Sequence, residues 1–215
     1  SRLARAPLLG SNTGVYLGYS SSDFMMLMSS SPLSKSVYAA TGSAGSIASG
    51  RLSYVLGLQG ACAMIDTACS AGLVAMNFAC GALTLGEAER GVVMAVNLVL
   101  SAGGAHTPFA VAGMTSPRGK CHTFDSRADG YARSEACGAA LVDGSSPPRL
   151  YLCGSAVRCD GRSASLTAPN GRAQQALIAA ALAASGRGVS AVRCIEAHGT
   201  GTALGDPMEA RAVSL

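Results

Sequence analysis

Two residues of this chain are placed where catalytic chemistry is possible, a cysteine and a histidine. Cys69 follows the apolar run at residues 61–67 and precedes a segment with helical spacing. A thiol at the N-terminus of a helix meets the positive end of the helix dipole, so it ionises more easily and becomes a nucleophile. Cysteine is also among the most frequently buried residue types, and packing in the core is the alternative interpretation of Cys69.

His198 ends a second apolar run, residues 192–197, and a turn of glycine and threonine follows it. It caps no element of the predicted structure, and the adjacent glycine would let a substrate approach. Asp206 and Pro207 are typical of the N-cap and first position of the next helix, and Glu209 lies where a capping box places it. We therefore expect His198 to take part in chemistry and the two carboxylates to cap the helix.

The elements that must position these residues alternate between strands and helices. Apolar runs predict strands at residues 15–18, 61–67, 91–100, 137–142, 150–157 and 192–197. Helical spacing predicts helices over residues 43–60, 70–86 and 173–185. The fold class is therefore α/β, and Cys69 and His198 both follow strands, at the sheet edge where such folds bind ligands.

Three expectations about the sheet follow from these runs. The strand–helix–strand unit of residues 61–100 predicts parallel pairing. The run 91–100 is almost continuously apolar, which is typical of a strand covered on both faces. Residues 137–142 and 150–157 read as neighbouring strands joined by a turn-rich link.

Composition excludes several classes of function. The net charge is only +4, and no basic stripe or aromatic residue interleaved with Lys or Arg is present, which argues against nucleic-acid binding. No apolar run reaches the ~18 residues of a membrane span. The eight cysteines include no C-x-x-C pair, so we expect packed thiols in a reducing compartment and no metal site. His106 and His122 lie in polar stretches, where a solvated loop histidine is the expected interpretation.

Several long motifs resemble one family. MIDTACSAGLVA (64–75) resembles the active-site stretch of β-ketoacyl synthases, and EAHGTGTALGDPMEA (196–210) resembles their first histidine motif. Three further segments resemble ketosynthase domains of type I polyketide synthases: YAATGSAGSIASGRLSYVLGLQG, CHTFDSRADGYARSEACGAALV and GSAVRCDGRSASLTAPNGRAQ. The resemblance runs from about Thr13 to the end of the chain.

The resemblance implies a thiolase-like fold with α-β-α-β-α layers, of which residues 1–215 would form an incomplete domain. It implies that Cys69 takes an acyl chain as a thioester from the 4′-phosphopantetheine arm of an acyl carrier protein. His198 would assist decarboxylation of a malonyl-type extender on that carrier and stabilise the enolate, which then attacks the acyl chain in a Claisen condensation. Thr200 and Thr202 match positions that hydrogen-bond the pantetheine arm, and satisfying the local backbone is their alternative role.

The resemblance also implies partners and limits. The domain itself would bind no cofactor, and it would form a homodimer, since the run 91–100 resembles the strand that pairs across the two-fold axis. Gly72 stands where many members have serine, and a glycine in the first turn is expected to loosen the helix. Ser134 and Ala136 stand where glycines are usual.

The second histidine motif and the catalytic lysine of the family do not occur in these 215 residues, so we expect the chain alone to be inactive. We expect a cytoplasmic, or plastid, enzyme of polyketide synthesis. The alternatives are the ketosynthase of a type I fatty-acid or polyunsaturated-lipid synthase and a non-catalytic scaffold piece.

Overall fold

The computed structural model describes residues 7–20, 23–144 and 150–214. Contacts divide the chain into two compact units, and neither unit is one continuous stretch. Unit 1 comprises residues 1–105 and 134–149, and unit 2 comprises residues 106–133 and 150–215.

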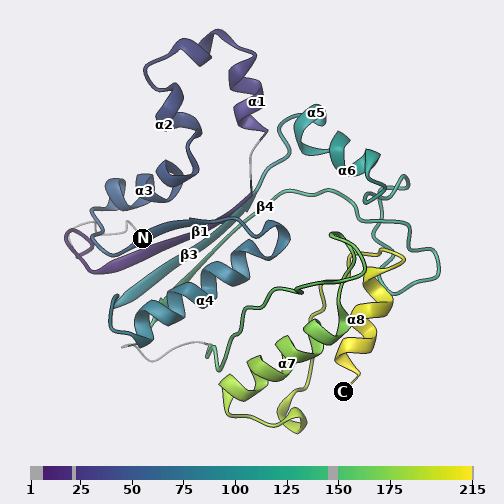
Figure 1. The fold of residues 1–215 in the computed structure, drawn as a ribbon. Helices are drawn as coiled ribbons and strands as arrows, with labels where there is room; N and C mark the ends of the chain where they lie inside the picture. The colour runs from purple at the N-terminus through teal and green to yellow at the C-terminus, as the bar shows by residue number, and fades with distance from the viewer. Residues whose placement is uncertain (1–6, 21–22, 145–149, 215) are drawn as a thin grey trace. The chain divides into compact units, whose positions relative to one another are not determined.

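Both units contain helices and irregular segments, and the described strands belong to unit 1 (Figure 1). Unit 1 contains β1 (Thr13–Tyr19), α1 (Phe24–Ser29), η1 (Pro32–Lys35), α2 (Ala39–Ser43), α3 (Gly45–Leu56), β2 (Cys62–Ile65), η2 (Ala68–Ser70), α4 (Ala71–Thr84), β3 (Arg90–Asn97), α5 (Ala102–Ala105) and β4 (Ala136–Asp143). Unit 2 contains α6 (Thr107–Val111), α7 (Gly171–Ser185), η3 (Val189–Ala191) and α8 (Gly205–Val213). The predicted helices at 43–60, 70–86 and 173–185 are confirmed as α3, α4 and α7.

The sheet of unit 1 has the strand order β2-β1-β3-β4. β1 pairs in parallel with both β2 and β3, whereas β4 runs antiparallel to β3. The expected parallel arrangement around α4 is therefore confirmed in direction, but β1 lies between the two strands that α4 connects. Arg90 and Asp143 face each other across β3 and β4, and their side chains form a salt bridge of 3.2 Å.

β3 is an interior strand, which corrects one expectation. It pairs with β1 along one edge and with β4 along the other, so neither edge is open to a second copy of the chain. The expectation that this strand pairs across a two-fold axis is therefore wrong. The outer strands of the described sheet are β2 and β4.

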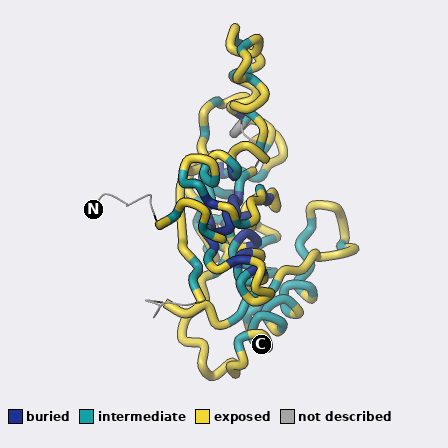
Figure 2. Tube along the Cα trace, turned by 90° about the vertical axis from the view of Figure 1, so that its left-hand side faces the viewer, coloured by how far each residue is buried: buried dark blue, intermediate teal, exposed yellow. Residues whose placement is uncertain are grey.

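Helices cover the two faces of the sheet unequally. Tyr16, Ile65 and Val93 pack in one core with the alanines and Val74 of α4. Met64, the neighbour of Ile65, points to the opposite face and lies beside Gly45 of α3. In Figure 2 the buried residues gather in one part of the trace, with exposed residues along the surrounding loops.

We expected β3 to be buried on both faces, but it is fully buried on one face only. Gly91 and Val93, which point toward α4, are buried, while Val92, Met94 and Val96 on the other face are half-buried.

Gly72 has a packing role in this arrangement. A Cβ at this position would lie 2.9 Å from the Cβ of Ala95 on β3, closer than real Cβ atoms approach each other. The glycine therefore lets the first turn of α4 contact the sheet directly. The sequence predicted only that a glycine here would loosen the helix.

Two of the predicted strands, both in unit 2, are not observed in the described residues. Residues 150–157 and 192–197 form no strand in the described structure, and Leu150, Tyr151 and Ile195 are exposed. Apolar composition indicates a tendency toward burial, but a strand also needs a neighbour for its backbone groups, and β4 pairs with β3 instead. The link at 145–149 lies outside the described residues.

The clearest predicted helix has strong local end signals. The Asn170 side chain accepts hydrogen bonds from the backbone N–H groups of Arg172 and Ala173, and Gly186 ends α7 with a left-handed backbone. α7 packs beside α8 (Figure 1). Among the described helices, none has the length and apolar character to cross a membrane.

Candidate active site

Cys69 lies at the junction between β2 and α4, where the sequence predicted it. β2 ends at Ile65, and Cys69 is the central residue of the 3-10 turn η2 that leads into α4. Cys69 is exposed, which is at odds with the alternative of core packing. The turn presents the thiol at the carboxyl edge of the parallel strands, where α/β folds bind ligands.

The turn before Cys69 has an unusual backbone. Ala68 has a φ of 53°, a left-handed conformation that non-glycine residues seldom adopt. Its N–H donates to Asp66 Oδ1 at 3.0 Å, and Ser70 Oγ donates to the carbonyl and the hydroxyl of Thr67, both at 2.9 Å. These hydrogen bonds hold the sharp turn that places the following residue, Cys69, on the surface.

The turn around His198 is held by two carboxylates of α8. Glu209 Oε1 accepts the His198 N–H at 2.6 Å, and Glu209 Oε2 accepts the Gly199 N–H at 2.8 Å. Asp206 is buried, and its carboxylate oxygens accept the Gly201 N–H at 2.9 Å and the Phe124 N–H at 2.6 Å.

The expected capping roles of these two residues are therefore wrong. α8 begins at Gly205 with Leu204 at the N-cap, and neither Leu204 nor the two carboxylates cap the helix there. The preceding turn folds back over the start of the helix, so its own N–H groups, rather than those of α8, reach the carboxylates of Asp206 and Glu209.

A second loop, residues 121–130, also hydrogen-bonds to this turn. The sequence did not predict this contact. Thr123 Oγ1 donates to the Gly199 carbonyl at 2.6 Å, and the Gly130 N–H donates to the Gly201 carbonyl at 2.8 Å. Gly201 has a φ of 68°, and a Cβ there would lie 1.5 Å from the Cys121 carbonyl oxygen. No side chain fits at this position, so the contact requires glycine.

Two ion pairs involve aspartates of the same loop. Arg127 hydrogen-bonds to Asp125 and holds the pKa of that carboxyl well below its usual range. The hydrogen bond from Ser116 and, after it, the Arg118 guanidinium lower the pKa of Asp129. Alternating Asp and Arg in CHTFDSRADG was the available sequence signal for this loop.

Thr200 and Thr202 lie in the His198 turn with their hydroxyl oxygens 3.0 Å apart. Thr202 Oγ1 also accepts the Gly205 N–H at 3.0 Å, so this hydroxyl serves the local backbone. Binding of the pantetheine arm by the pair stays a prediction.

The structure brings His198, Thr200 and Thr202 together in unit 2, whereas Cys69 lies in unit 1. The meeting of Cys69 with His198 stays a prediction. His106 is exposed and His122 is half-buried in the 121–130 loop. Cys62 and Cys137 lie on strands but are exposed, which differs from the expectation of packed thiols. Within the described ranges, no cluster of three or more metal-ligating side chains occurs.

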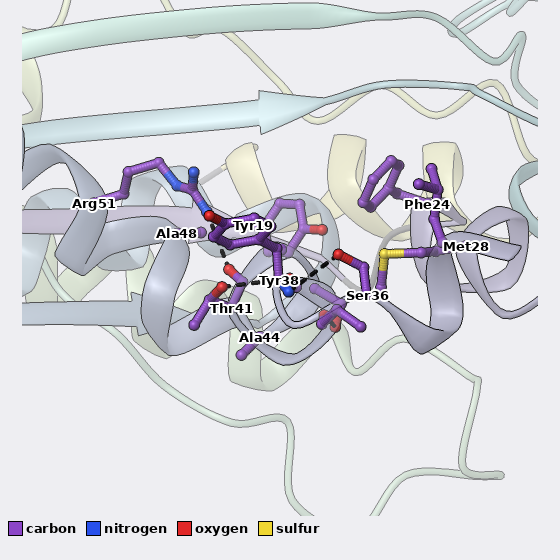
Figure 3. Close-up of a pocket in the computed structure, with 13 residues that line it drawn as sticks. Tyr19, Phe24, Met28, Ser36, Tyr38, Thr41, Ala44, Ala48 and Arg51 are labelled. Carbon is purple, nitrogen blue, oxygen red and sulfur yellow. Dashed lines mark hydrogen bonds between the residues drawn. The ribbon is translucent and has the colours of Figure 1, made fainter.

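Unit 1 contains a pocket that was not expected from the sequence (Figure 3). Its volume is about 480 Å³, and its lining includes Tyr19 at the end of β1, Phe24 and Met28 of α1, and Arg51 of α3. Arg51 Nη2 donates to the Thr41 carbonyl at 3.0 Å across the pocket wall. The methionine-rich run FMMLM was the available signal for an apolar surface here.

The chain matches two family models in sequence. "Beta-ketoacyl synthase, N-terminal domain" matches residues 1–147, and "Beta-ketoacyl synthase, C-terminal domain" matches residues 151–214. The chain is 42% identical over 220 residues to the spectinabilin polyketide synthase system protein NorC of Streptomyces orinoci, covering 99% of this chain and 10% of that protein. It is also 42% identical over 215 residues to the polyketide synthase GfsB of Streptomyces halstedii, covering 97% of this chain and 4% of that protein.

Solved ketosynthases have the same fold. The oxazolomycin ketosynthase domain OzmH KS7 of Streptomyces albus superimposes with a TM-score of 0.89 at 31% identity, covering 98% of this chain and 38% of that one. The ketosynthase from module 6 of the bacillaene synthase of Bacillus subtilis gives a TM-score of 0.84 at 31% identity, covering 98% of this chain and 37% of that one. These likenesses confirm the predicted thiolase-like α/β fold. The chain therefore belongs to the β-ketoacyl synthase family.

Proposed function

We propose that this chain supplies the nucleophile and one histidine of an enzyme that extends polyketides by decarboxylative Claisen condensation. The observation that carries the proposal is the exposed Cys69 in a strand-to-helix turn, directly after the left-handed backbone of Ala68. Membership of the family and 42% identity to two polyketide synthase proteins support the substrate class.

In the first step, the Cys69 thiolate attacks the carbonyl carbon of an acyl chain that an acyl carrier protein holds as a thioester. A new C–S bond forms to Cys69, the original C–S bond breaks, and the carrier's sulfur leaves and takes up a proton. The acyl chain is then held on Cys69 as a thioester, so the thiolate can serve as the leaving group of the second step.

In the second step, a malonyl-type thioester on the carrier protein loses CO2, and the electron pair of the broken C–C bond forms an enolate. An N–H donor on the His198 ring stabilises the charge that develops on the enolate oxygen. The enolate carbon attacks the Cys69 thioester, which forms the new C–C bond and releases the Cys69 thiolate.

Thr200 and Thr202 suit the amide groups of a pantetheine arm. The pair has two hydroxyl hydrogens, and only one of them lies between the two oxygens. The second can be donated to an amide carbonyl of the arm. The arm belongs to the carrier protein, so the chain itself supplies only the binding groups.

We also propose a homodimer that forms through β2, because this strand is one of the two outer strands of the described sheet, its residues Cys62 and Ala63 are exposed, and it leads directly into the Cys69 turn. Open strand edges pair readily with other chains, and a lysine on such an edge opposes pairing. Sedimentation of the full-length native protein and of its Ala63→Lys variant tests this, with the variant expected at half the mass.

The nucleophile is tested by incubating the full-length protein with an acyl N-acetylcysteamine thioester and mapping the acylated peptide. Acylation is expected at Cys69 and is expected to disappear in Cys69→Ala. Cys159→Ala is the matched control, because Cys159 is also exposed and would be labelled as well if exposure alone decided acylation. Faster acylation of Cys121 or Cys159 than of Cys69 would refute the assignment.

A further inference from the structure

The Glu209 side chain, which the sequence pattern predicted to cap a helix, hydrogen-bonds to the backbone at His198 and at the next residue. Glu209 uses both carboxylate oxygens, one on the N–H of His198 at 2.6 Å and one on the N–H of Gly199 at 2.8 Å. Two successive peptide groups are thereby fixed by one carboxylate. We infer that Glu209 is a positioning residue that sets the direction of the His198 side chain.

The charge of Glu209 strengthens this hold. In the described part of the chain, Glu209 forms no ion pair, so its two backbone hydrogen bonds are its polar contacts. Hydrogen bonds to a carboxylate are roughly twice as strong as those between neutral groups. A glutamine at this position has one acceptor oxygen, and its amino group would face the second N–H, so it cannot reproduce the pair.

The rest of the turn has other tethers. Gly201 is held by Asp206 Oδ1, the Gly201 carbonyl accepts the Gly130 N–H, and the Gly199 carbonyl accepts Thr123 Oγ1. Loss of the Glu209 carboxylate therefore leaves the turn attached to α8 and to the 121–130 loop. It frees only the peptide groups next to His198, which separates positioning from folding.

This role rests on the function proposed above, in which His198 acts in decarboxylation and not in acyl transfer to Cys69. A misplacement of about 1 Å at a reacting group can lower a rate by ~10²-fold. We therefore expect Glu209→Gln to slow decarboxylation by ~10- to 100-fold, while the acylation rate of Cys69 is unchanged.

The experiment uses the full-length native protein and the variants Glu209→Gln, Glu209→Asp, Glu196→Gln and His198→Ala. CO2 release from malonyl N-acetylcysteamine, as kcat and KM, and acylation of Cys69 are measured together with the unfolding midpoint. Glu196 is the matched control, because it is exposed, lies two residues before His198, and makes no hydrogen bond with another described residue. A lower kcat at constant KM in Glu209→Gln, partial recovery in Glu209→Asp and no effect in Glu196→Gln would support the role.

Two results would overturn this role alone. One is a Glu209→Gln variant that matches Glu196→Gln, and the other is an equal loss in both steps together with a lower unfolding midpoint. A native protein without CO2 release, or a His198→Ala variant that retains it, would overturn the proposed function and this role with it.

Discussion

The contact between Gly72 and Ala95 gives a quantitative test of how α4 is seated on the sheet. In Gly72→Ala the new Cβ would lie 2.9 Å from the Ala95 Cβ. Carbon atoms prefer ~3.5–4.0 Å, so the helix or the strand must shift. Overpacking of this kind destabilises by ~1–3 kcal/mol, against a gain of up to ~1 kcal/mol from replacing glycine in a helix. We expect a net loss of up to ~2 kcal/mol.

The same helix contains the control. Gly81 also lies in α4, but a Cβ there meets no atom within 4 Å. Gly81→Ala is therefore expected to stabilise the protein by up to ~1 kcal/mol. Ala95→Gly removes the atom that Gly72→Ala would strike, so the double variant should recover ~1–3 kcal/mol relative to the sum of the single changes.

The assay is urea unfolding of the full-length protein, followed by hydrogen exchange of the α4 peptides, with the rate of Cys69 alkylation as a second readout. The alkylation rate should change in Gly72→Ala, because the displaced first turn of α4 directly follows η2. Additive effects of Gly72→Ala and Ala95→Gly, or equal stabilisation by Gly72→Ala and Gly81→Ala, would refute the reasoning.

Two further predictions concern the 121–130 loop and the turn before Cys69. The pKa values of Asp125 and Asp129 are lowered in the folded chain. Their stabilising effect is therefore complete above the unfolded value of ~3.9 and is lost as the pH falls from there through the folded values. Hydrogen exchange of the loop, compared at about pH 5 and about pH 2, should show this opening, and Asp125→Asn should weaken the dependence; an unchanged profile would contradict it. Ala68→Val should lower stability by about 1 kcal/mol or more, because a β-branched residue fits the left-handed backbone at this position less well than alanine does. Ala68→Gly removes the strain and should be neutral or stabilising; equal unfolding midpoints for the two variants would count against a strained turn.

The sequence predicted helices and strands well where the pattern of apolar residues lies within one continuous segment. The spacing of apolar residues identified α3, α4 and α7, and the apolar runs identified β1 to β4. The position of Cys69 between a strand and a helix was also predicted, because both flanking patterns are adjacent to it in the sequence.

The remaining features depend on contacts between distant segments. Residues 150–157 are as apolar as a buried strand, but the sequence does not show whether a neighbouring strand exists. The interior place of β3 depends on β1 and β4, which come from far along the chain. Asp206 and Glu209 match a capping pattern, and only the folded-back turn shows that their oxygens serve residues 198–201 and Phe124.

The split of unit 2 along the chain has a consequence for exchanging segments between synthases. The chain leaves unit 1 after α5, passes through residues 106–133 of unit 2, and returns to unit 1 just before β4, whose first residue pairs with the last residue of β3. Residues 106–133 match the N-terminal family model, whereas the His198 turn matches the C-terminal one. Thr123 and Gly130 of the first segment nevertheless hydrogen-bond to the His198 turn. A recombinant joined between residues 147 and 151 would therefore combine the loop of one parent with the histidine turn of the other. Hybrids in which Thr123, Gly130 and the His198 turn all come from the same parent should be more active than hybrids joined between residues 147 and 151.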